Sequence, residues 1–271
     1  MMDERPIGVF DSGLGGLTAM RVLRRLLPEE DIIYFGDTAR VPYGTRSAAT
    51  VTKFALLDAN FLLRQGVKLI VVACGTVSSI AMEELRRQCP VPVLGIVEPV
   101  AQAAVNISRN RRIAILGTSA TIRSRAIEKE LLRLAPDAQV KALACPMLVP
   151  LIENGYLDEN QPALAAVLRE YLSYINDYKV DTIILGCTHY PLVANAIHHF
   201  LPMVRLIDSG EAVAQEACRL LADGALTNAP GHAGKRSYFV TDTVANFANM
   251  VELFLGAPGD GEIRQVDIDA W

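Results

Sequence analysis

The chain has 271 residues, of which 51% are hydrophobic and 21% are charged, and its formal net charge at pH 7 is −4. At about 150 residues per domain this length predicts roughly two domains, and the composition is that of a globular protein with a full core. The slightly acidic balance argues against nucleic acid or an anionic membrane surface as the main partner. No apolar run reaches the ~18 residues of a membrane span, and the acidic start MMDERPIGVF does not resemble a signal peptide, so we expect a cytoplasmic protein.

Short apolar runs alternate with longer helical stretches along the chain. This alternation predicts an α/β fold with mostly parallel sheets, and the continuous apolar strands indicate burial by helices on both faces. Strands are predicted at residues 7–10, 32–35, 69–73, 93–95, 113–116, 140–143, 182–185 and 204–207. Helices are predicted at residues 17–27, 47–64, 79–87, 120–134 and 162–174.

A weak internal repeat divides the chain into two similar units. IGVFDSG at 7–13 resembles IAILGTS at 113–119, VPYG at 41–44 has a looser counterpart in VPLIENG at 149–155, and the two offsets are nearly equal. Residues 226–235 are predicted to form a loop, after which 237–242 should return to the first unit. We therefore expect one α/β domain from residues 1–97 plus 208–271 and a second, similar domain from residues 98–207.

Two cysteines occur in matching contexts, one in each unit. Cys74 lies in VVACGTVS and Cys187 in IILGCTHYP, so each follows a buried strand and precedes a threonine and a predicted helix. A single cysteine in an apolar run is usually a core residue, but this matched pair favours two thiols acting on opposite faces of one substrate. A helix N-terminus would lower the thiol pKa from its ordinary value of about 8.5.

The other cysteines, Cys89, Cys145 and Cys218, lack such a context and are interpreted as core residues. The odd number of cysteines, with no CxxC pair and no Cys/His cluster, predicts neither a disulfide framework nor a metal site.

Polar residues follow several of the predicted strands, where parallel α/β sheets bind their ligands. DSGLGG, which begins at Asp11, has neither the GxGxxG order nor a GK[ST] sequence, so its glycines favour a tight turn over a nucleotide site. Tyr43 is either a turn aromatic or part of a fixed loop near the site. His189 is either a structural hydrogen-bonding residue or a partner of Cys187, and Glu153 is either a solvated carboxylate or a site residue.

The motifs FDSGLGGLT, YFGDTARVPYG, VVACGT, ILGT, VPLIENG and ILGCTHYPL, in this order and spacing, resemble the cofactor-independent glutamate racemases over roughly residues 6–210. The resemblance implies two α/β domains, related by a pseudo-two-fold axis, with the active site between them. It also implies a cytoplasmic homodimer that uses no cofactor or metal and supplies D-glutamate for peptidoglycan.

The resemblance also implies a two-base mechanism on L- and D-glutamate. In it Cys74 deprotonates the D-enantiomer and Cys187 the L-enantiomer, with Asp11, Glu153 and His189 as acid/base helpers. The substrate-binding positions that it implies are Asp11, Ser12, Pro42, Tyr43, Gly44, Gly75, Thr76, Thr118, Thr121, Thr188 and His189.

One position departs from the family pattern. Gly75 stands where the family has asparagine, and the missing amide predicts weaker or altered substrate binding, with a water or a neighbouring group in its place. Two alternatives stay open at this point: a racemase of another amino acid in the same superfamily, and a non-catalytic two-domain protein that binds an amino acid.

Overall fold

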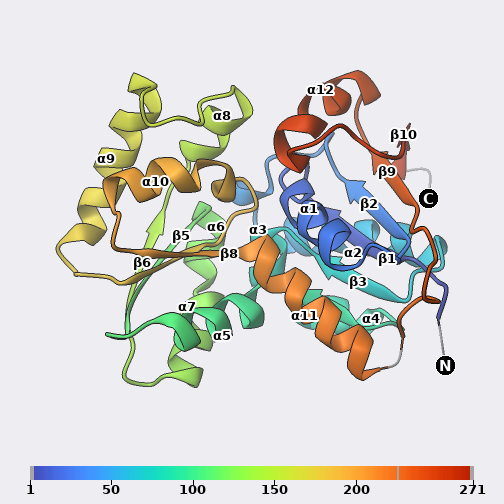
Figure 1. Cartoon of the computed structure of the whole chain (residues 1–271), viewed down its shortest axis with the longest axis horizontal. Coiled ribbons are helices and arrows are strands. Elements are labelled where there is room, and N and C mark those ends of the chain that lie inside the picture. Colours follow the sequence, from blue (N-terminus) through green and yellow to red (C-terminus); the bar gives the residue numbers. More distant parts are fainter. Residues whose placement is uncertain (1–2, 225, 269–271) are drawn as a thin grey trace.

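Two β-sheets flanked by helices make up the protein (Figure 1). The structure is a computed structural model that describes residues 3–224 and 226–268, and every strand pairing in this part is parallel. The first sheet has the order β10-β9-β2-β1-β3-β4 and consists of β1 (Ile7–Asp11), β2 (Ile32–Gly36), β3 (Leu69–Val72), β4 (Val93–Gly95), β9 (Arg236–Val240) and β10 (Glu262–Gln265). The second has the order β6-β5-β7-β8 and consists of β5 (Arg112–Gly117), β6 (Gln139–Ala144), β7 (Thr182–Leu185) and β8 (Arg205–Asp208).

The two sheets repeat one strand order. The run β2-β1-β3-β4 of the first sheet corresponds to β6-β5-β7-β8 of the second, so the segments that the internal repeat pairs are the central strands β1 and β5. The strands β1, β3 and β7 are buried along their whole length, as expected for strands covered on both faces. The predicted α/β class with two mostly parallel sheets is confirmed.

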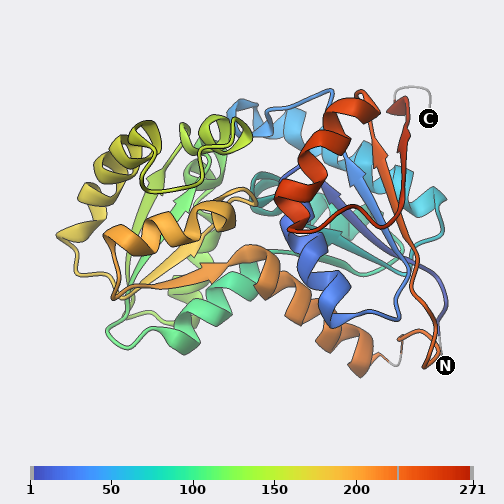
Figure 2. The ribbon, with the colours of Figure 1, turned by 45° about the horizontal axis from the view of Figure 1, so that its top comes forward.

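The helices cover both faces of each sheet (Figure 2). They are α1 (Leu17–Leu26), α2 (Ala48–Arg64), α3 (Gly75–Ile80), α4 (Met82–Gln88), α5 (Val97–Ile107), α6 (Ser119–Ser124), α7 (Ala126–Leu134), α8 (Leu148–Glu153), α9 (Pro162–Asn176), α10 (Ala194–Phe200), α11 (Ser209–Asp223) and α12 (Val244–Leu255), with 3-10 turns η1 (Tyr43–Thr45) and η2 (Tyr190–Val193). Side-chain caps fix several starts: Ser47 accepts from the Thr50 N–H, and Asp208 accepts from the N–H groups of Gly210 and Glu211.

Some predicted boundaries are wrong. The helix predicted at 120–134 is split into α6 and α7 because Arg125 adopts a left-handed conformation with φ of 57°. The helix predicted at 79–87 corresponds to two short helices, the first of which begins already at Gly75. The elements α5, α8, α12 and β10 were not predicted, since short or non-alternating apolar segments give weak periodicity.

The two sheets are joined through α5 and α11. The helix α5 follows β4 and precedes β5, whereas α11 follows β8 and packs against both α1 and α5. One hydrophobic cluster contains residues of both sheets, Val9 and Ile115 among them. The carboxyl ends of both sets of strands border the space between the two units, and the loops that follow these strands are the candidates for a site.

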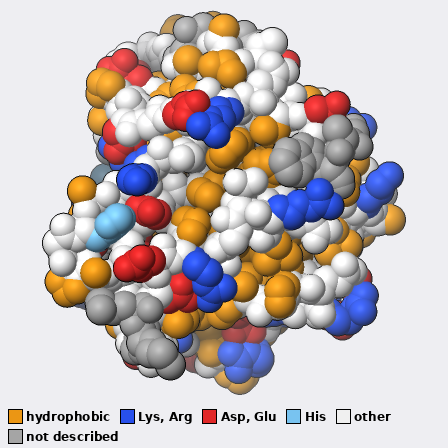
Figure 3. Space-filling model, turned by 90° about the vertical axis from the view of Figure 1, so that its right-hand side faces the viewer, with side chains coloured by type: hydrophobic (Ala, Val, Ile, Leu, Met, Phe, Trp, Pro, Cys, Tyr) orange, Lys and Arg blue, Asp and Glu red, His pale blue; other side chains and the backbone are white. Residues whose placement is uncertain are grey.

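The surface carries mixed charge. On the face that carries the C-terminal strands, acidic, basic and hydrophobic side chains are interspersed (Figure 3). In the described part of the chain, no helix combines the length and the apolar character that a bilayer crossing requires.

A buried ion pair ties the start of the chain to the first sheet. The ammonium group of Lys68 is inaccessible to solvent, lies 2.6 Å from a carboxylate oxygen of Glu30 and donates to the Asp3 carbonyl at 2.6 Å. The other carboxylate oxygen of Glu30 accepts from the Asn228 N–H at 2.7 Å. These bonds hold residues from three distant parts of the sequence together.

Replacing Lys68 with alanine is expected to lower the free energy of unfolding by about 3–5 kcal/mol, because the Glu30 carboxylate is left buried without its counter-charge. Arg25→Ala is the control, since its ion pair with Glu211 is exposed and is worth about 0–1 kcal/mol. Urea denaturation of both variants measures the two values. Equal losses in the two variants would contradict the interpretation.

Candidate active site

A cavity of about 420 Å³ lies between the two units. Its lining comes from loops that follow β1, β2 and β3 of the first sheet and β5, β6 and β7 of the second. The volume falls in the range of small-molecule sites. The following residues of the predicted site line the cavity: Ser12, Pro42, Tyr43, Gly44, Cys74, Gly75, Thr76, Thr118, Glu153, Cys187, Thr188 and His189.

Two of the predicted substrate-binding residues do not line the cavity. Asp11 is 1% exposed and lies behind the wall, where its carboxylate accepts from the Gly13 N–H at 3.0 Å and from the Thr188 hydroxyl at 3.5 Å. Thr121 is buried behind Thr118, with their hydroxyl oxygens 3.0 Å apart. Asp11 therefore contacts the cavity lining through Gly13 and Thr188, and Thr121 contacts it through Thr118.

Cys74 forms part of the first unit's wall. It follows β3 by two residues, occupies the N-cap of α3 and is 5% exposed, and its Sγ lies 3.5 Å from the Ser12 hydroxyl oxygen. Burial, and after it the charge of Asp11, raise the pKa of the Cys74 thiol to about 12. The expected lowering of this pKa by a helix N-terminus is wrong for Cys74, because the desolvation of a thiolate outweighs the effect of the helix.

Cys187 faces the cavity from the second unit and is 6% exposed. Its Sγ lies 3.9 Å from Nδ1 of His189, and Nε2 of His189 lies 2.9 Å from a carboxylate oxygen of Glu153. Burial disfavours a charged imidazole, but the bonds to Cys187 and Glu153 outweigh it and raise the pKa of His189 to about 10. The helical structure predicted after Cys187 and Thr188 begins with a 3-10 turn at Tyr190 and continues as α10 from Ala194.

The two thiols therefore have different partners. Asp11 lies on the Cys74 side, and burial raises the pKa of its carboxyl while the His189 charge and the bond from Gly13 oppose this rise. The Cys187 side has an imidazole that holds a proton at neutral pH. One thiol of the cavity therefore lies near a carboxyl group, and the other lies near an imidazole.

Threonine hydroxyls connect the two units beside the cavity. The hydroxyl oxygens of Thr76 and Thr118 are 2.9 Å apart, and Thr118 caps α6 by accepting from the Thr121 N–H at 3.2 Å. Thr188 is held by Thr18, whose hydroxyl donates to the Thr188 carbonyl at 2.9 Å. These hydroxyls can donate to a bound carboxylate.

The loop after β2 is held by a buried charge cluster that sequence reasoning missed. The Tyr43 hydroxyl donates to Asp37 and, at 3.2 Å, to Asp58, and Tyr43 is among the residues that line the cavity. Arg40 pairs with Asp37 at 2.7 Å and with Asp58 at 3.2 Å. A sequence signal existed, since Asp58 occupies the otherwise apolar buried face of α2.

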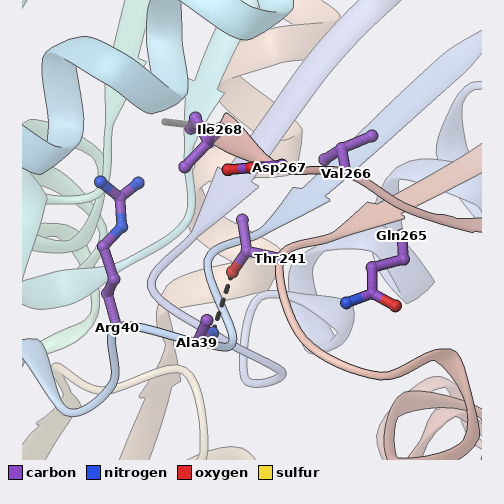
Figure 4. A pocket seen from close by; sticks show the side chains of 7 residues that line it. All are labelled: Ala39, Arg40, Thr241, Gln265, Val266, Asp267 and Ile268. Carbon is purple, nitrogen blue, oxygen red and sulfur yellow. Dashed lines mark hydrogen bonds between the residues drawn. The ribbon is translucent and has the colours of Figure 1, made fainter. Parts of the chain in front are cut away.

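Burial, together with the charge of Asp37, raises the pKa of the Asp58 carboxyl well above its ordinary value. Arg40 also borders a second cavity of about 440 Å³, which is lined by Ala39, Arg40, Thr241, Gln265, Val266, Asp267 and Ile268 (Figure 4). There the Ala39 N–H donates to the Thr241 hydroxyl oxygen at 2.9 Å, and the Thr241 hydroxyl donates to Asp37 at 2.9 Å. The cluster thus links the C-terminal strands to the wall of the first cavity.

The structure shows what lies in place of the missing amide at Gly75. A Cβ atom at Gly75 would lie 2.1 Å from the carbonyl oxygen of Gly186. The space that a side chain would occupy is therefore filled by backbone of the second unit, so that of the two expected replacements a neighbouring group, the Gly186 carbonyl, is the one found there.

Comparison with known proteins shows which family the chain belongs to. The Asp/Glu/Hydantoin racemase family model matches residues 7–217. The glutamate racemase of Geobacter metallireducens is 43% identical over 270 residues, which cover 99% of each chain. Two solved structures match this chain over the whole length of both chains. The glutamate racemase from Francisella tularensis in complex with D-glutamate has a TM-score of 0.92 and 37% sequence identity. The glutamate racemase from Thermus thermophilus in complex with beta-chloro-D-alanine has a TM-score of 0.89 and 43% sequence identity. On this evidence the chain belongs to the Asp/Glu/hydantoin racemase family, among the glutamate racemases.

Proposed function

We propose that this chain interconverts L- and D-glutamate with Cys74 and Cys187 as the two bases. The observation that carries the proposal is the pair of buried thiols, which come from equivalent positions of the two sheets and line one cavity. The similarity to a glutamate racemase that was solved with D-glutamate supports the choice of substrate.

The reaction exchanges one proton for another at the α-carbon. A thiolate on one face takes the α-proton, which leaves its electron pair on the carbon, and the opposite thiol returns a proton to the other face. Cys74 acts on D-glutamate and Cys187 on L-glutamate, so each turnover exchanges the protonation states of the two sulfurs. Asp11 on one side, and His189 with Glu153 on the other, restore these states by moving protons to and from the thiols.

Burial and the charge of Asp11 favour the protonated form of Cys74, so the substrate itself must help to ionise it. The ammonium group of a bound amino acid adds a positive charge in a site that excludes water, and this charge favours a nearby thiolate. The hydroxyls of Thr76, Thr118 and Thr188 can donate to the substrate carboxylates and stabilise the negative charge that develops on the α-carbon and its carboxylate.

The remaining substrate contacts belong to the same proposal. Ser12, Pro42, Tyr43, Gly44, Gly75 and His189 line the cavity, while Asp11 and Thr121 act from behind its wall.

The division of the strands into two sheets supports the predicted domains, with the boundary falling one residue before the end of β8. We propose one domain from residues 1–97 plus 208–271 and another from 98–207, since β1–β4, β9 and β10 belong to one sheet and β5–β8 to the other. We also propose a cytoplasmic homodimer that supplies D-glutamate for peptidoglycan. Analytical ultracentrifugation tests the oligomeric state.

The activity itself is tested by circular dichroism of an L-glutamate solution. The signal should decay to zero, because the two enantiomers are equally stable, and the α-proton should be replaced by deuterium in deuterated water. Folded enzyme that binds glutamate without either change would favour the amino-acid-binding alternative. Turnover of a different amino acid at a higher kcat/KM would favour the other racemase alternative.

The assignment of one thiol to each enantiomer predicts opposite exchange defects in two variants. Cys74→Ser should slow deuterium wash-in into D-glutamate by about 10²–10⁴-fold while Cys187 still exchanges L-glutamate, and Cys187→Ser should do the reverse. Exchange must be measured, because the equilibrium constant of one keeps kcat/KM equal in the two directions of racemisation. Cys89→Ser, outside the cavity, is the control, and equal defects for both enantiomers in each variant would refute the assignment.

The raised pKa of His189 predicts a pH-dependent contribution to stability. Its value of about 10 lies above the ordinary 6.5, so the charged form stabilises the fold fully below pH 6.5 and this contribution is lost as pH rises toward 10. The Tm difference between the unmodified protein and His189→Gln should therefore be largest below pH 6.5 and shrink toward pH 10. His199→Gln, at an exposed position, is the control. A difference independent of pH would show that His189 has the same pKa in the folded and unfolded protein, and would contradict the prediction.

A further inference from the structure

Three glycines of the first unit touch the second unit at the cavity. A Cβ atom at Gly15 would lie 2.1 Å from the Thr188 hydroxyl oxygen, one at Gly44 would lie 2.9 Å from Cβ of Thr118, and one at Gly75 would lie 2.1 Å from the carbonyl oxygen of Gly186. Cβ atoms in proteins essentially never come within 3.0 Å of such atoms. We call these three residues the seam glycines.

The contact of Gly75 is the least adaptable of the three. Gly15 and Gly44 face side chains, whereas Gly75 faces backbone. That backbone is fixed, since the N–H of Gly186 donates to the Leu116 carbonyl at 2.8 Å beside β7. Gly75 itself begins α3 and does not adopt the positive φ that requires glycine. Position 75 therefore requires glycine because a side chain would lack space there, and not because of the backbone conformation.

The contact also joins the two segments that carry the thiols. Gly75 directly follows Cys74, and Gly186 directly precedes Cys187. A methyl group at position 75 would have to move its neighbour from 2.1 Å to at least 3.0 Å, and both segments are anchored in secondary structure. The expected result is that the two thiols move apart by roughly 1 Å, a displacement that can cost about 10²-fold in rate.

We propose that Gly75 is a positioning residue that sets the distance between the Cys74 and Cys187 thiols, with Gly15 and Gly44 extending the same close contact around the cavity. The proposal rests on the proposed function only in its kinetic consequence. An asparagine at position 75, as in the family pattern, fits this chain only with a wider gap between the units. Extra room for a larger substrate does not explain Gly75, since the direction of its missing side chain is occupied by the Gly186 carbonyl.

The thiol spacing can be measured directly with bifunctional methanethiosulfonates of graded spacer length. Cys89 and Cys218, which are only half-buried, are first replaced by serine in every protein tested. Mass spectrometry of the bridged peptides then identifies the shortest reagent that links Cys74 to Cys187 and separates it from links to Cys145. Gly75→Ala should require a longer spacer than the parent protein, and its kcat should fall by about 10²-fold in both directions.

Two alanine variants serve as matched controls. A Cβ at Gly8 meets side chains of Leu62 and Val67 at 3.0 Å, within the first unit, so Gly8→Ala should lower Tm without changing the spacer or kcat. Gly259 lies in an exposed loop, where a Cβ would meet only the Val251 side chain at 3.2 Å, and Gly259→Ala should leave the spacer length and kcat unchanged. If Gly75→Ala does not fold, Gly15→Ala provides the same test, because its Cβ would displace Thr188 and His189.

An unchanged spacer and an unchanged kcat in a folded Gly75→Ala protein would overturn the proposal. A change confined to KM and to the choice of amino acid would overturn it as well, and would assign Gly75 to specificity. If Gly75→Ala requires a longer spacer but the parent protein does not racemise glutamate, the positioning role is supported and the proposed function is refuted.

Discussion

Removal of water from the thiols is the constraint on which the rest of this structure depends. Cys74 and Cys187 are almost fully buried beyond the carboxyl ends of equivalent strands, and burial raises the pKa of the Cys74 thiol. The same absence of water strengthens every interaction with a charge that enters the cavity. In the proposed mechanism, the Cys74 thiol therefore becomes a base when the substrate ammonium group is bound.

The two halves of the cavity meet this constraint in different ways. On one side the carboxyl group of Asp11 lies behind the wall and raises the pKa of Cys74 further. On the other side the pair of His189 and Glu153 holds a proton near Cys187. Two similar folding units thus surround their thiols with opposite electrostatic environments, and such a difference suits a reaction that begins and ends with one sulfur as a thiolate and the other as a thiol.

Close contact between the units is the second requirement, because opposed thiols are useful only at a fixed distance. The loop after β2, which contributes Tyr43 to the cavity lining, is held by Arg40, Asp37 and Asp58. The seam glycines remove side chains where the units touch. The buried charge cluster and the absence of side chains at the seam glycines therefore both fix the position of the cavity wall between the two sheets.

The sequence by itself determined the α/β class, the repeat of two parallel units and the grouping of polar residues at strand ends, because apolar runs and strand-end motifs are local signals. It also singled out Cys74, Cys187, His189 and Glu153 through their motifs. Only the tertiary structure decided that Asp11 and Thr121 lie behind the wall, that burial outweighs the helix at Cys74, and that Asp58 binds Tyr43. It alone showed the close contact of Gly75 with Gly186. A close approach of two backbones that lie far apart in the chain depends on how the units pack and produces no periodic pattern in the sequence.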